Sequence, residues 1–193
     1  MRVQFKSSYD DDINLFQDNR HRIQYGILVL LVLAAPFVLP EYFVGELTQI
    51  AIWSLAGLGL MLLIGHTGQV SLGHAAFMAI GAFANIALMT RGWPFIPALL
   101  ASAVITGVAG ALLARPLLRM TGIYLAIATL ALSVIIEDIA IIAEPVTGGV
   151  SGVFAPIIEL FGYEIDRYGT PTAFYYLCLA VLLLVTLMYA NLL

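Results

Sequence analysis

Residues 47–90 read LTQIAIWSLAGLGLMLLIGHTGQVSLGHAAFMAIGAFANIALMT and contain no Asp, Glu, Lys or Arg. A helix that crosses a hydrocarbon core of about 30 Å needs roughly 20 apolar residues. These 44 residues are therefore long enough for two crossings. The middle of the stretch, residues 65–74, is polar and rich in glycine. We expect two membrane helices joined by an interrupted segment near 65–74.

The rest of the chain has the same apolar character. Of its 193 residues, 62% are hydrophobic and 10% are charged, whereas soluble domains average roughly 45–50% and about 25%. The uncharged stretches predict helical spans at 23–40, 47–65, 71–90, 95–114, 121–143 and 171–193. The predicted fold class is an all-α polytopic membrane protein with about six transmembrane helices and a long outer loop near 144–170.

Several classes of function are disfavoured by the sequence. The chain has too few polar residues to form the water-exposed surface of a soluble enzyme. Its net charge of −4, without a basic run, argues against nucleic acid as a partner. Ser71 and His74 have the spacing of a nucleophile and a base, and His66 and His74 could bind zinc, but nothing beyond spacing supports either site. We expect no catalytic residues, no metal site and no enzymatic activity in this chain.

The basic residues indicate the orientation in the membrane. A cytoplasmic N-terminus places six of the eight Lys and Arg residues inside, and leaves Arg91 and Arg167 outside. We expect residues 1–22 to form a solvated cytoplasmic tail; an interfacial helix that uses Ile13, Leu15 and Phe16 is the alternative. Residues 23–193 then form the transmembrane domain.

The polar segment supplies the candidates for a solute pathway. If the helix resumes at Ser71, one helix face carries Ser71, His74, Met78, Gly81 and Asn85. Uncharged polar groups in a membrane helix are costly unless they face other helices or water. Simple hydrogen bonding between helices is the alternative role. We expect the following residues to line a pathway: Thr67, Gly68, Gln69, Ser71, His74 and Asn85.

A second polar stripe lies in the fifth predicted span. It consists of Gly122, Ala126, Thr129, Ser133 and Glu137. Because Glu137 lies 18 residues beyond Arg119, about 27 Å along a helix axis, we place it near the outer boundary. The predicted outer-mouth residues are Glu137, Asp138, Thr147, Gly148 and Gly149. Proton coupling through Glu137 is the alternative.

Three blocks of the sequence, in this order, resemble one family. They are GHTGQVSLGHAAF at 65–77 followed by Gly81-Ala82-Phe83, GIYLAIATL at 122–130, and Thr147-Gly148-Gly149 with Gly152. Together they resemble the LivM-type permease subunits of branched-chain amino acid ABC importers. The resemblance covers roughly residues 50 to 155.

The resemblance implies a permease subunit that forms part of the translocation pathway for branched-chain amino acids. It implies four kinds of partner: a homologous H-type permease, two cytoplasmic ATPases, a periplasmic amino-acid-binding protein and the lipid bilayer. It places the chain in a bacterial inner membrane, with ATP bound by the partner subunits and no cofactor in this chain. The acidic loop 144–170 is then a docking surface for the binding protein.

The chains of that family continue beyond the point at which this sequence stops, at Leu193. We therefore expect 23–193 to be an incomplete permease domain. Three alternatives stay open: an ABC permease for urea or short amides, an ion-coupled secondary carrier that uses Glu137, and a non-transporting membrane subunit.

Overall fold

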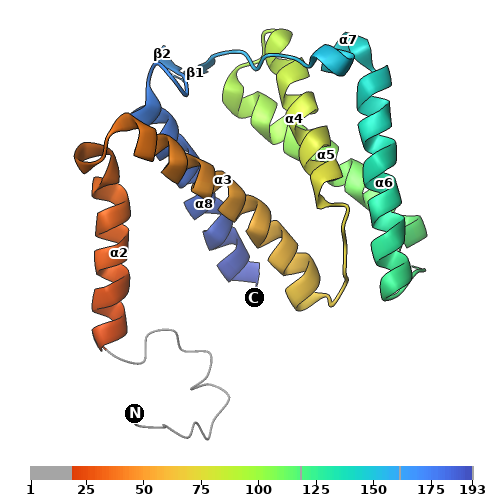
Figure 1. The fold of residues 1–193 in the computed structure, drawn as a ribbon, viewed down its shortest axis with the longest axis horizontal. Helices are drawn as coiled ribbons and strands as arrows, with labels where there is room; N and C mark the ends of the chain where they lie inside the picture. Colours follow the sequence, from red (N-terminus) through yellow and green to blue (C-terminus); the bar gives the residue numbers. More distant parts are fainter. Residues whose placement is uncertain (1–18, 118, 161, 193) are drawn as a thin grey trace, which may run out of the picture.

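The computed structural model describes residues 19–117, 119–160 and 162–192, and most of the predicted N-terminal tail, 1–18, lies outside them. Within the described residues, long helices occur at all six predicted positions, and the predicted all-α fold class is confirmed (Figure 1). Helix α2 begins at Asn19, so the last four residues of the predicted tail are helical. The long helices are α2 (Asn19–Val38), α3 (Glu41–Met61), α4 (His74–Thr90), α5 (Phe95–Leu117), α6 (Ile123–Ile142) and α8 (Pro171–Leu192).

Among the described residues, four helical stretches are long and apolar enough to cross a membrane. They are Glu41–His66, Phe95–Leu117, Ile123–Ile142 and Pro171–Asn191. The apolar part of α2, Ile23–Val38, and helix α4 are shorter. With 17 residues, α4 is about 26 Å long. The prediction of a helix from Ser71 is wrong, because Ser71, Leu72 and Gly73 are not helical.

The predicted interruption is confirmed, and its geometry explains how the helix ends. Helix α3 widens into a π-helical turn, η1 (Leu62–His66), and the Thr67 hydroxyl donates a hydrogen bond to the Leu63 carbonyl. Gly68 then has φ +64°, a left-handed conformation that glycine adopts without steric cost. The chain leaves the helix there and stays non-helical up to Gly73.

The helices form two groups (Figure 1). Helix α3 packs along α8, and α4 packs along α5 and contacts α6. The interrupted segment 67–73 connects the two groups. Side chains of α8 also reach α2, where the Tyr175 and Tyr176 hydroxyls donate to the Val32 and Leu33 carbonyls at 2.9 Å and 2.7 Å.

The long connection between α6 and α8 contains structure of its own. It begins with the short helix α7 (Glu144–Thr147) and the 3₁₀ turn η2 (Gly149–Ser151). A hairpin of β1 (Ile158–Leu160) and β2 (Tyr163–Ile165) follows, with β1 against α5 and β2 against α8. The sequence did not predict this hairpin. The hairpin contacts both helix groups and lies at the end of the bundle opposite to the start of α6 (Figure 1).

Candidate functional site

A cavity of 970 Å³ lies where the interrupted segment meets α3, α4, α5 and α6. Most of its wall is aliphatic or aromatic and comes from all four helices. Its polar side chains carry no formal charge; they are Gln69, Ser71, Asn85, Ser102, Thr106 and Thr129. The cavity therefore offers apolar surface and a few neutral hydrogen-bonding groups, the usual make-up of a small-molecule site.

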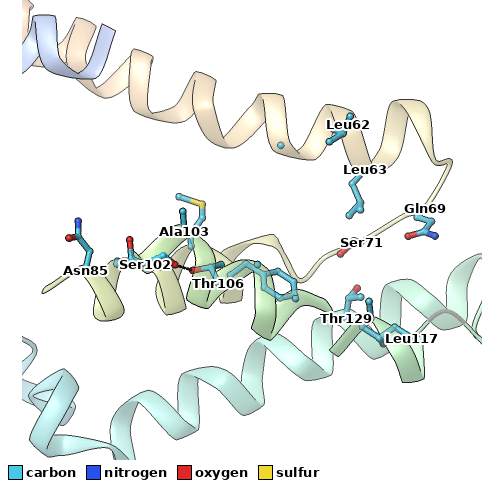
Figure 2. A pocket seen from close by; sticks show the side chains of 18 of the residues that line it. Leu62, Leu63, Gln69, Ser71, Asn85, Ser102, Ala103, Thr106, Leu117 and Thr129 are labelled. Atoms are coloured by element: carbon cyan, nitrogen blue, oxygen red, sulfur yellow. Dashed lines mark hydrogen bonds between the residues drawn. The ribbon is translucent and has the colours of Figure 1, made fainter. Parts of the chain in front are cut away.

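The polar groups are concentrated at two ends of the cavity. Figure 2 shows Gln69 and Ser71 at one end and Asn85 and Ser102 at the other. The Ser102 hydroxyl donates to the Leu99 carbonyl at 2.8 Å, so its proton is committed within α5. Asn85 Oδ1 is buried without a hydrogen-bond partner among the described residues. A buried acceptor of this kind is costly.

The non-helical segment is held against α6 by its backbone. The Leu72 N–H donates to Thr129 Oγ1 at 3.0 Å, and the Ser133 hydroxyl donates to the Leu72 carbonyl at 3.3 Å. A Cβ on Gly73 would lie 3.1 Å from the Thr129 carbonyl oxygen and 3.2 Å from its Cβ. A side chain at this position would therefore force the segment or α6 to shift by a few tenths of an ångström. Ser71, Gly73 and Thr129 are all buried.

The structure places the predicted pathway residues in two sets. Gln69, Ser71 and Asn85 line the cavity. Thr67 and Gly68 instead form the end of η1, through a side-chain hydrogen bond to Leu63 and a left-handed turn.

His74 belongs to neither set. It opens α4, and its ring lies against α3, where Cε1 is 3.0 Å from the position of a Cβ on Gly59. Of the residues expected on one polar face, Met78, Gly81 and Asn85 line the cavity, whereas His74 packs against α3.

Sequence reasoning missed two polar residues of the cavity, Ser102 and Thr106 of α5. The Thr106 hydroxyl donates to the Ser102 carbonyl at 2.8 Å, and a Cβ on Gly81 would lie 3.2 Å from Thr106 Oγ1. The available signal was their spacing of four residues, which places two hydroxyls on one face of an apolar helix. Among the described residues, no group of three His, Cys, Asp or Glu side chains could hold a metal ion.

The predicted outer-mouth residues have different surroundings. Glu137 and Ser133 line a smaller crevice of 470 Å³ between α4 and α6, which η2 also borders. Asp138 is exposed. Thr147 is buried, and its hydroxyl lies 2.5 Å from the Ala140 carbonyl oxygen and 2.9 Å from that of Ala143, so it caps the end of α6.

The two glycines that follow Thr147 allow a tight turn. Gly148 and Gly149 have φ of +73° and +57°, and a Cβ on Gly148 would lie 2.1 Å from the Gly152 carbonyl oxygen. The Thr-Gly-Gly sequence therefore shapes the start of the connection between α6 and α8.

Residues 42–192 match the model of the family described as the permease component of branched-chain amino acid transport systems. The chain belongs to this family. The expected membership of a branched-chain amino acid permease family is thereby confirmed. No solved structure matches this permease.

Two relatives are similar over 143 residues, or 72% of this chain. Both are the high-affinity branched-chain amino acid transport system permease protein LivM, one from Salmonella typhimurium at 35% identity and one from Escherichia coli at 36% identity. The matched region is 33% of each relative. The permease thus spans about a third of the length of the curated relatives that it matches.

Proposed function

We propose that this permease forms part of the translocation pathway of an ATP-driven importer for branched-chain amino acids. The observation that carries the proposal is the uncharged cavity, with neutral polar groups at two ends and an apolar wall between them. A branched aliphatic side chain fits such a wall, and the charged ends of a zwitterion accept hydrogen bonds from, or donate them to, neutral groups. The interrupted segment offers the solute non-helical backbone at the cavity, as in many carriers.

The proposed machine needs partners. This sequence has no phosphate-binding loop of the GxxxxGK[ST] type, so we assign ATP binding to two separate cytoplasmic ATPases. A homologous H-type permease completes the pathway, and a periplasmic binding protein docks on the outer connection that contains α7 and the hairpin. We place the chain in a bacterial inner membrane with a cytoplasmic N-terminus, which puts Arg115 and Arg119 inside.

The primary test is uptake of labelled leucine in cells whose chromosomal copy of the gene carries Gln69→Leu. Gln69 lines the cavity, so this variant should reduce uptake while its abundance in the membrane stays unchanged. Gln49→Leu in α3 is the matched control, because Gln49 is a partly buried glutamine outside the cavity lining. Normal uptake by Gln69→Leu would remove the cavity from the pathway.

Two further measurements separate the proposed importer from the alternatives. Excess unlabelled leucine should compete with labelled leucine, whereas competition by urea or a short amide would favour a permease for those solutes. Copurification of a second permease and ATPases in mild detergent would support the importer. Uptake that persists without ATP and is abolished by Glu137→Gln would favour an ion-coupled carrier instead.

A further inference from the structure

Both backbone groups of Leu72 are hydrogen-bonded to side chains of a distant helix. Its N–H donates to Thr129 and its carbonyl accepts from Ser133, across separations of 57 and 61 residues. Thr129 and Ser133 are four residues apart on α6, so their hydroxyls lie on one helix face, one turn apart. The two hydroxyls therefore bind the N–H and the carbonyl of a single residue in the non-helical segment.

These two hydrogen bonds satisfy backbone groups that the interruption of the helix leaves without helical partners. Non-helical backbone inside a membrane has no water to satisfy its N–H and carbonyl groups, and each unsatisfied group is costly. Leu72 lies between the end of η1 and the start of α4, so no regular helix supplies its partners. Hydroxyls from α6 supply both.

These two hydrogen bonds can also break without leaving the hydroxyls of α6 unpaired. The single proton of the Ser133 hydroxyl has two acceptors within reach, the Leu72 carbonyl at 3.3 Å and the Thr129 carbonyl at 3.2 Å. The Thr129 hydroxyl donates its own proton to the Ala126 carbonyl at 3.0 Å. If the segment moves away, both hydroxyls keep an acceptor within α6, and only the backbone of Leu72 needs new partners.

We propose that Thr129 and Ser133 are positioning residues that form a releasable clip on Leu72 and so hold Gln69 and Ser71 in the wall of the cavity. A tight clip keeps these side chains in place before the solute arrives, and its release lets the segment move during a transport cycle. The link to solute rests on the proposed function, whereas the clip itself is a property of the chain.

The clip is tested by cysteine labelling, which does not depend on transport. The native cysteine is removed with Cys178→Ala, and Ser71→Cys places a thiol at a buried position of the segment. Thr129→Val keeps the shape of the side chain but removes its hydroxyl. Loss of one neutral hydrogen bond shifts an equilibrium by about fivefold, so the labelling rate of a small thiosulfonate reagent in native membranes should rise by about that factor.

Three variants sharpen the test. Thr129→Ser retains the hydroxyl and should restore slow labelling. Ser133→Ala removes the second bond at a less buried position, and it serves if Thr129→Val is poorly expressed. Thr186→Val is the matched control, because the Thr186 hydroxyl is exposed and donates to Leu182 within its own helix; its labelling rate should equal that of the parent.

Uptake of leucine by the same variants, without the labelling substitutions, distinguishes this proposal from the proposed function. A loosened clip should raise KM by about fivefold with a smaller change in the maximal rate, and Thr129→Ser should restore KM. Unchanged labelling in both Thr129→Val and Ser133→Ala would overturn the clip, whatever the uptake. Faster labelling of the variants, combined with no leucine uptake by the parent chain, would support the clip and refute the proposed function.

Discussion

A proline in α2 leaves one backbone carbonyl of that helix without its helical hydrogen-bond donor, and a tyrosine of α8 donates to that carbonyl instead. Pro36 lies inside the helix and has no N–H, so the Val32 carbonyl four residues earlier lacks its usual helical donor. The Tyr175 hydroxyl donates to that carbonyl at 2.9 Å, and the Tyr175 side chain is only 2% exposed. Tyr175→Phe should therefore leave a part-buried carbonyl unpaired while the ring still fills its site.

The expected cost is about 1–2 kcal/mol in the free energy of unfolding, because the carbonyl is part-buried and the usual penalty for a buried polar group that loses its partner is about 1–3 kcal/mol. Tyr176→Phe is the matched control. It removes a bond of 2.7 Å to the Leu33 carbonyl, which has a helical donor available in Phe37. Its cost should be smaller than that of Tyr175→Phe.

A double-mutant cycle isolates the role of Pro36. Pro36→Ala restores an N–H that can donate to Val32, so Tyr175→Phe should cost less than about 1 kcal/mol in that background. The free energy of unfolding is measured for all four proteins by titration with SDS in mixed micelles. Equal costs of Tyr175→Phe in the two backgrounds would refute the reasoning, because the carbonyl freed by the proline would then not be what the tyrosine satisfies.

Three further substitutions test the backbone of the interrupted segment and the end of α6. Gly73→Ala should destabilise the chain by roughly 1–3 kcal/mol through overpacking against Thr129, seen as a lower melting temperature than that of Gly57→Ala, whose added Cβ meets nothing within 4 Å. Gly68→Val should cost about 1–2 kcal/mol or more because φ is +64° there, and unchanged thermal stability would mean that the turn is not left-handed. Thr147→Val should lose about 1–3 kcal/mol with its buried hydroxyl and should speed proteolysis of the connection between α6 and α8, whereas Thr147→Ser should not.

The positions of the helices were predictable because they depend on local properties. The length of each uncharged stretch sets whether a helix can cross the apolar layer, and the polar, glycine-rich run at 65–74 marks where a helix must stop. The match of residues 42–192 to the family model then confirmed that this interruption lies in a permease component. Gln69, Ser71 and Asn85 were predictable as cavity residues because polar groups in an apolar span need a buried partner or a solute.

The hairpin at Ile158–Leu160 and Tyr163–Ile165 was not predictable on these grounds. Each strand has three residues, and Glu159 pairs directly with Glu164, an arrangement of like charges that local preference disfavours. The strands lie between α5 and α8, and Ile165 is buried. Contacts with helices that are distant in sequence therefore stabilise a pairing that the segment alone does not favour.

The sequence by itself determined that this chain is a polytopic, all-α membrane protein with an interruption near residues 65–74, because hydrophobic length and glycine content act locally. The tertiary structure decided which polar residues serve the cavity. In the structure, His74 packs against Gly59, Ser102 lines the cavity, and the Leu72 N–H donates to Thr129. Such pairings depend on how helices rotate and approach one another, and that packing is set by all their side chains together.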